Sequence, residues 1–333
     1  MVVLRKMRPY GNQIAQKPVN TDQSPNLRQS YDDSKDYQSD ARAVALQNVP
    51  LDAARMAELK AALANREYTR AETILVEEIN RETARDAKSP RAAKLLAAAA
   101  GIFFLNGEFL NAAISYKKAE AIAPLNPRDR FTLAMAYIKL DRRDWARPEL
   151  ERLVADDAKN ALYLYWLGRL DYDAQSYNTA IAKFRQVIQL DPQMARAYDN
   201  LGLCYDYLGQ YDEAIKHYNT AIRLNRKQAR PSAWPHLNLA VTLTAKEDLD
   251  GAENQLREAL RYDGRLPQAH YHLGLVLEKR GKYTEAIESL RQAVTHDPSY
   301  AEPHYTMGLI YQRLGEKELA REEMELFQKL KKR

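Results

Sequence analysis

Hydrophobic and small residues recur along this chain with a period of 34 residues. Alanine returns seven times, at Ala112, Ala146, Ala180, Ala214, Ala252, Ala286 and Ala320. The gaps between these alanines are 34 residues, except for one of 38 residues between Ala214 and Ala252. Pro124, Pro192 and Pro298 keep the same spacing and require the same four-residue insertion, for which 229–232 is the candidate. Two series that agree on one insertion indicate a tandem array.

Each 34-residue repeat is patterned as two amphipathic helices. When the first residue of a repeat is position 1, apolar and small residues favour positions 4, 7, 8 and 11, and again positions 20, 24 and 27. These are the spacings of one helix face. Alanine or glycine at positions 8 and 20 lets the two backbones approach closely, and a glycine such as Gly209 can end the first helix in the left-handed conformation. The predicted repeats are 93–126, 127–160, 161–194, 195–228, 233–266, 267–300 and 301–333.

The N-terminal part of the chain departs from this pattern. Residues 1–45 are rich in Asn, Gln, Ser and Asp and have few aliphatic residues, so they predict a disordered polar leader. Residues 52–85 form a degenerate helix pair, in which Tyr68 and Ala71 match the second helix of a repeat. At the other end, the charged last helix, from Glu316 to Lys332, has the polar outer face expected of a cap.

Two segments carry a family resemblance. Its residues are Tyr198, Leu201, Gly202, Tyr205, Gly209, Tyr211, Ala214, Tyr218 and Ala221, and then Tyr271, Leu273, Gly274, Gly281, Tyr283, Ala286, Ala293 and Pro298. They resemble the tetratricopeptide repeat. The resemblance implies an all-α fold, a right-handed α-solenoid of tandem 34-residue helix-turn-helix repeats whose first helices line a concave groove. The strict 34-residue period argues against the 35-residue RNA-reading helical repeat.

Charge and chemistry point away from catalysis. The chain has 50 Lys and Arg residues against 45 Asp and Glu, a net charge of +5, and four of the positive charges lie in the last five residues. The rest of the chain is therefore nearly neutral, so its charge gives only weak support for a nucleic-acid partner. The single cysteine, Cys204, excludes an intramolecular disulfide and a cysteine-cluster metal site. The sequence has no phosphate-binding loop, no nucleophile elbow and no His-Glu-x-x-His motif. We expect no enzyme activity and no cofactor.

Three histidines occupy position 4 of successive repeats. They are His236, His270 and His304. Neighbouring repeats are spaced by about 10 Å, whereas two ligands of one zinc ion lie within roughly 3–4 Å of each other. We therefore interpret these histidines as packing residues and expect no metal site.

Targeting signals are absent from the start of the chain. The most apolar run, from Leu95 to Leu105, has eleven residues, and a membrane-spanning helix needs about 20. The sequence as given is expected to be cytoplasmic, with no membrane span. A periplasmic or secreted location stays open if a leader has been removed.

Positions 2, 5, 6, 9, 12 and 13 of each first helix lie off the packing face and are expected to line the groove. The candidate partner-binding residues there are Arg128, Tyr165, Trp166, Arg169, Tyr172, Arg196, Asn200, Tyr207, Trp234, Asn238, Tyr271 and His272. Aromatic residues and arginine dominate binding hot spots. Packing between repeats is the alternative role for the aromatic residues at position 5. Asn200 and Asn238 resemble two rungs of the asparagine ladder with which some long family members hold a peptide backbone.

The function that follows is a non-catalytic scaffold or adaptor, which binds an extended peptide or a partner helix in the concave groove. An accessory or regulatory subunit of an enzyme, or of an export or assembly complex, is the alternative. A nucleic-acid binder is less favoured, because acidic and basic residues are mixed in the groove. The chaperone-tail receptors of the family use a cluster of positive charges that this chain does not supply. Self-association through exposed repeat ends stays open.

Overall fold

Residues 49–332, which the computed structural model describes, form sixteen α-helices in eight consecutive pairs. The first helices of the pairs are α2 (Ala53–Ala64), α4 (Pro90–Leu105), α6 (Pro127–Lys139), α8 (Ala161–Asp173), α10 (Ala195–Tyr207), α12 (Trp234–Ala245), α14 (Pro267–Lys279) and α16 (Glu302–Leu314). The second helices are α3 (Tyr68–Arg85), α5 (Phe109–Glu120), α7 (Arg143–Asp156), α9 (Tyr177–Leu190), α11 (Tyr211–Asn225), α13 (Leu249–Tyr262), α15 (Tyr283–His296) and α17 (Lys317–Lys331). The predicted leader, 1–45, lies outside the described residues.

Side-chain caps mark the starts of the first four first helices, α2, α4, α6 and α8. Ser89 accepts a hydrogen bond from the Ala92 N–H at 3.0 Å, and Pro90 is the first residue of α4. Since proline has its φ fixed near the helical value and lacks the N–H that a first turn leaves unpaired, the pair of residues starts the helix ahead of residue 93. Asn126 and Pro127 repeat the arrangement at the start of α6.

Every turn between the two helices of a pair contains one residue with a left-handed backbone. The residue is Gly107, Gly209, Gly281 or Gly315 in four turns, and Arg66, Asp141, Gln175 or Glu247 in the other four, with φ of 57–63°. A side chain makes this conformation unfavourable by about 1–2 kcal/mol. The turns with glycine and the turns without it therefore share one backbone geometry. In the turns without glycine, packing of the whole repeat holds the residue in the left-handed conformation.

The two helices of a pair cross where a side chain is absent. A Cβ atom added to Gly202 in α10 would lie 2.6 Å from the ring of Tyr218 in α11, and the ring is fully buried. Gly274 in α14 stands in the same relation to Leu290 in α15. The small residue at position 8 is therefore required by the large residue at position 24.

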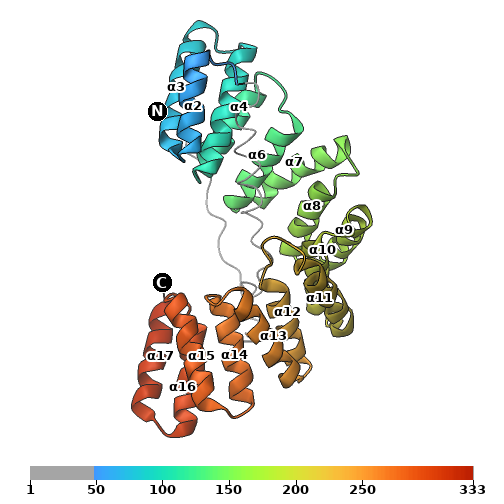
Figure 1. Ribbon diagram of the computed structural model, residues 1–333, viewed down its shortest axis with the longest axis vertical. Helices are drawn as coiled ribbons and strands as arrows, with labels where there is room; N and C mark the ends of the chain where they lie inside the picture. Colours follow the sequence, from blue (N-terminus) through green and yellow to red (C-terminus); the bar gives the residue numbers. More distant parts are fainter. Residues whose placement is uncertain (1–48, 333) are drawn as a thin grey trace, which may run out of the picture.

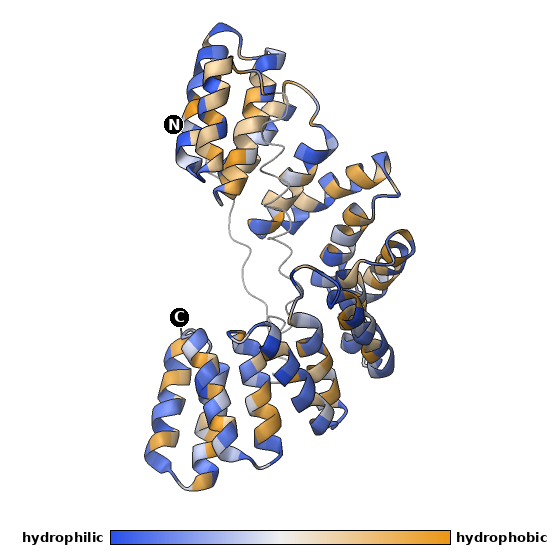
Figure 2. Ribbon diagram, viewed as in Figure 1, coloured by the Kyte–Doolittle hydropathy of each residue, from blue (hydrophilic) through white to orange (hydrophobic). Residues whose placement is uncertain are grey.

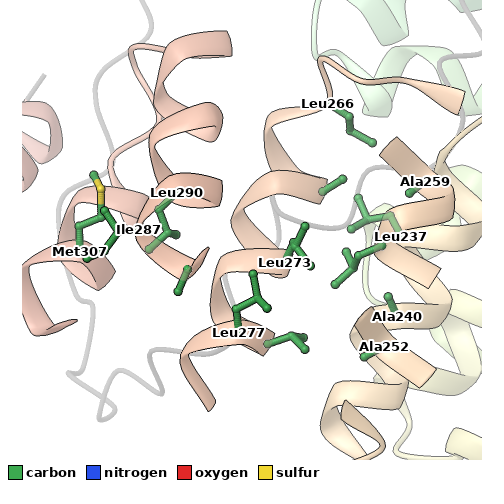
Figure 3. Packing of buried hydrophobic residues seen from close by; sticks show 14 of the residues in the cluster. Leu237, Ala240, Ala252, Ala259, Leu266, Leu273, Leu277, Ile287, Leu290 and Met307 are labelled. Atoms are coloured by element: carbon green, nitrogen blue, oxygen red, sulfur yellow. The ribbon is translucent and has the colours of Figure 1, made fainter. Parts of the chain in front are cut away.

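The hydrophobic core continues from pair to pair. Leu237 of α12, Leu273 and Leu277 of α14, and Leu290 of α15 belong to one buried cluster, which reaches Met307 of α16 (Figure 3). Three further clusters follow the same scheme along the rest of the described chain. In Figure 2 hydrophobic and hydrophilic residues alternate along the helices, as expected when each helix turns one stripe to its neighbours.

The pairs follow one another along an arc, with α2 and α17 at its ends (Figure 1). Successive first helices contact one another directly, from α8 through α16 and between α4 and α6. Within residues 49–332 no two successive second helices come into comparable contact. Because neighbours are closest on the inner side of an arc, the first helices line the concave face.

The last helix ends the array with a polar face. In α15, positions 21 and 25 carry Ile287 and Arg291, which are turned toward the next first helix: Ile287 is buried in the cluster that includes Met307, and Arg291 donates to the Tyr311 hydroxyl at 2.9 Å. In α17, positions 21, 25 and 28 carry the exposed residues Arg321, Glu325 and Gln328. Such a surface is stable in water without another repeat.

The four turns without glycine give the first prediction. We expect Gln175→Gly to raise the free energy of unfolding by about 0.5–1 kcal/mol, because glycine adopts φ near 58° without a Cβ clash. Urea denaturation measures the change. Gln175→Ala removes the same side chain but keeps the Cβ atom, so it should give no such gain. Equal stability of the two variants would contradict the argument.

Candidate partner-binding site

The twelve predicted groove residues lie on five consecutive first helices. Arg128 is on α6; Tyr165, Trp166, Arg169 and Tyr172 are on α8; Arg196, Asn200 and Tyr207 are on α10; Trp234 and Asn238 are on α12; Tyr271 and His272 are on α14. Tyr165, Asn200 and Asn238 are buried, with exposed fractions of 0, 0 and 2%. The other nine are half-buried and present part of their surface to solvent.

The amide of Asn200 connects α8 to α10. It accepts a hydrogen bond from the Arg169 guanidinium at 2.7 Å and donates to the hydroxyl of Tyr165 at 3.1 Å. It also donates to the carbonyl of Arg196 in its own helix at 2.8 Å. In this structure the amide is engaged with the protein itself, and it holds Arg169 in a fixed place at the concave face.

Asn238 makes the equivalent connection one repeat later. Its amide donates to both carboxylate oxygens of Asp199, at 3.1 and 3.2 Å, and so links α12 to α10. Both asparagines are at position 6, and both bond to the residue at position 5 of the preceding repeat. Thr242 adds a third link by donating to Asp206 at 2.6 Å. Sequence reasoning missed the role of Asp199, although an acid at position 5 followed by an amide at position 6 of the next repeat is a usable signal.

Tyrosines form a cluster at one end of α8 and α10. Tyr207 stacks on Tyr177 with ring centres 5.1 Å apart, and Tyr172 meets both edge-on at 5.7 and 5.8 Å. Burial, followed by the proximity of the Tyr207 hydroxyl, raises the pKa of Tyr172, so the phenol stays neutral. The three half-buried rings hold one another in place.

The tryptophans border this surface and also pack inward. Trp166 meets Tyr165 edge-on at 5.7 Å and lies against the buried clusters on both sides of α8. Trp234 packs against the core of the C-terminal repeats. Further along, Tyr271 contacts Tyr300 and His272 at 5.2 and 5.3 Å.

Two arginines set the electrostatics of the central concave face. Arg196 lies over the ring of Tyr165, 4.7 Å from its centre, and Arg169 lies 5.6 Å from the ring of Tyr172. Asp173 approaches Arg169 at 3.8 Å. Guanidinium groups held against aromatic faces are suited to fix the orientation of a bound chain through hydrogen bonds and charge. We call Trp166, Arg169, Arg196, Tyr207 and Trp234 the aromatic–arginine face.

Two of the position-4 histidines bond within their own repeats, and the third bonds to the end of the preceding repeat. His236 is 2.7 Å from the side-chain oxygen of Gln255, and His304 is 2.6 Å from Glu323, position 23 in each case. His270 bonds to the carbonyl of Gly264 at 3.0 Å. In residues 49–332 no three potential metal ligands come together.

Cys204 is fully buried in α10, and this burial raises the pKa of its thiol to about 12. The side chain is thus a neutral packing group at physiological pH. Among the helices of the described chain, none combines the length and the apolar character that crossing a membrane requires.

The sequence matches tetratricopeptide repeat family models in its C-terminal half. Two overlapping matches to a tetratricopeptide repeat model cover residues 160–227 and 193–263, and further repeat models match 279–315 and 301–333. The chain is a tetratricopeptide repeat protein. Such membership supports a role in protein–protein interaction and implies protein partners.

Known relatives share only part of their length with this repeat protein. It is 30% identical over 104 residues to Cell division cycle protein 27 homolog A of Arabidopsis thaliana, covering 30% of this chain and 14% of that protein. It is 28% identical over 212 residues to the BBSome complex member BBS4 of Bos taurus, covering 54% and 41%.

A solved tetratricopeptide repeat protein from Parabacteroides merdae shares the fold. It superposes with a TM-score of 0.63 at 18% identity, over 81% of this chain and 97% of its own. At that identity the likeness confirms the all-α repeat solenoid that the sequence predicts, and concerns the fold alone.

The Asn238–Asp199 contact generates a stability prediction. We expect Asn238→Ala to lower the free energy of unfolding by about 1–3 kcal/mol, because two hydrogen bonds to a buried carboxylate are lost. Urea denaturation of Asn238→Ala, Asp199→Ala and the double variant forms a cycle in which the double variant should lose less than the sum. Strict additivity would show that the contact contributes no coupling.

Three histidines, of which His236 is buried and His217 and His270 are half-buried, generate a pH prediction. Burial lowers the pKa of His217, His236 and His270 below the ordinary 6.5, and around His236 the Gln255 bond and Glu258 oppose the shift while Arg226 adds to it. The unfolded chain therefore binds protons more readily. The free energy of unfolding should therefore be highest above about pH 6.5 and should fall as the pH drops below that value.

Urea denaturation at a series of pH values measures this fall, with His236→Gln as the matched variant. Glutamine keeps a hydrogen-bonding group beside Gln255 and has no proton to gain, so its curve should be flatter than that of the wild type. If the wild type and His236→Gln lose stability in parallel as the pH falls, His236 does not contribute to the pH dependence.

Proposed function

We propose that this chain is a non-catalytic scaffold that binds an extended peptide or a partner helix along its concave face. The observation that carries the proposal is the aromatic–arginine face on α8, α10 and α12. Its side chains are half-buried, so they are held in place and yet reach solvent. Aromatic and guanidinium groups positioned in advance lose little conformational entropy on binding.

The inter-repeat hydrogen bonds support the same proposal. Asn200 fixes Arg169, and Asn238 ties α12 to α10 through Asp199. These bonds keep three successive first helices in register, so the spacing between Trp166 and Trp234 is determined by the solenoid. A binding surface built on rigid elements is selective for partners whose side chains have the matching spacing.

A second candidate is a subunit of a larger assembly. One relative is named as a complex member, BBS4 of the BBSome, and this chain covers 41% of its length. In that role the concave face would hold another subunit permanently. A partner recovered at fixed stoichiometry in a native complex favours this candidate over a transient adaptor.

Charge reversal tests the concave face at two half-buried arginines, of which Arg196 also packs on the ring of Tyr165. We expect Arg128→Glu/Arg196→Glu to weaken partner binding by at least about tenfold, because both side chains lie on first helices at the groove. Affinity capture from native extract followed by titration with the captured partner measures the loss. The tryptophans are less suitable, since Trp166 also packs against two buried clusters.

The matched control is Lys216→Glu/Arg223→Glu, which makes the same charge change on exposed positions of the second helix α11. It should retain the partner. Retention by both variants would place binding elsewhere on the chain. The nucleic-acid alternative would be favoured if both variants lost the partner, if binding weakened steeply with rising salt concentration, and if the captured fraction contained nucleic acid.

A further inference from the structure

The last helix breaks the repeat pattern at two positions. At position 26 the six preceding repeats carry Lys118, Arg152, Gln186, Thr220, Glu258 and Gln292, and the last carries Leu326. At position 19 they carry Asn111, Trp145, Thr179, Glu213, Gly251 and Glu285, and the last carries Leu319. The repeat fold therefore works with mostly polar residues at these positions, and α17 replaces both with leucine.

These leucines do not serve the packing of α17 on α16. That contact uses Met324, which lies against Gly308, and Phe327, which meets Tyr305 at 5.2 Å. Leu319 and Leu326 remain 39% and 42% exposed. With Leu330 they follow the i, i+7, i+11 spacing, so the three form one stripe on a different side of the helix. We call them the leucine stripe.

The leucine stripe is also distinct from the face that a further repeat would cover. That face carries Arg321, Glu325 and Gln328, which close the array with polar groups. An exposed apolar stripe beside a polar cap has no role in extending the solenoid. Aligned apolar residues that reach solvent make this side of α17 a candidate interaction surface.

The charges along α17 are complementary to those of a second, antiparallel α17. Residues 316–323 hold four acidic and two basic residues, and residues 324–332 hold one acidic and three basic residues. Glu322 and Lys329 are exposed, lie seven residues apart, and flank the leucine stripe on the same side. A two-fold axis beside Leu326 brings Glu322 of each copy against Lys329 of the other.

We infer that two copies of this chain associate through α17, with the leucine stripes packed antiparallel and reciprocal Glu322–Lys329 pairs at the margin. An interface on a two-fold axis must be complementary to itself, and this stripe meets that condition in both apolar character and charge. The dimer carries two concave faces, so a partner with two binding segments gains avidity. This inference is independent of what the concave face binds.

Light scattering of the full chain over a range of concentrations tests the inference. The wild type should approach twice the mass of one chain. Leu319→Gln/Leu326→Gln should weaken self-association by more than about a hundredfold, because four leucines leave the interface. Circular dichroism confirms that the variant remains helical. A wild type that stays monomeric at every concentration would overturn the inference.

The matched control is Leu110→Gln/Ile114→Gln, which removes two exposed apolar residues from α5, 58% and 44% exposed. It should leave the mass unchanged, and so should the groove variant Arg128→Glu/Arg196→Glu. Equal disruption by the α5 variant would mean that association is non-specific and would reject the α17 interface.

Charge exchange tests the antiparallel pairing itself. Glu322→Lys and Lys329→Glu should each weaken the homodimer by about tenfold, since each places like charges in contact. A mixture of the two variants, or the double variant E322K/K329E, should restore association. Failure of both combinations to restore it would rule out the reciprocal pairs and the proposed orientation.

Discussion

The structure depends on one constraint: a helix pair of this size cannot bury its own apolar stripe. Leu237, Leu273 and Leu290 belong to three helices but share one cluster, so each pair completes the core of the next. Burial across these contacts contributes roughly 25 cal/mol per Å² of apolar surface, and it is gained only when repeats stack. The close approach of Gly202 to Tyr218 shows how tightly position 8 is fitted to position 24.

Stacking also fixes the concave face. Because the first helices lie on the inner side of the arc, polar groups at positions 5 and 6 of neighbouring repeats come within hydrogen-bonding distance, as in Tyr165–Asn200 and Asp199–Asn238. A buried amide satisfied by the neighbouring repeat stabilises the register and positions Arg169 at the surface. The interaction that maintains the solenoid is therefore the same one that organises the candidate binding site.

The last helix pair differs, because among the described residues only one of its sides packs against another pair. The polar residues Arg321 and Glu325 cover the face where another repeat would pack. The leucine stripe lies beside that cap, on a helix whose two halves carry opposite charge. The polar cap and the self-complementary leucine stripe thus lie on different sides of α17.

Sequence alone determined the repeat period, the helix pairs and the all-α fold, because spacing and small residues at fixed positions are local, periodic signals. It also identified which helices carry the aromatic and arginine candidates. It could not distinguish a side chain offered to a ligand from one used between repeats. Asn200 and Asn238 occupy groove positions by spacing, but only the stacking of α8, α10 and α12 brings Tyr165 and Asp199 to them. Such contacts join residues 35 and 39 apart and depend on the curvature of the array, which no local pattern records.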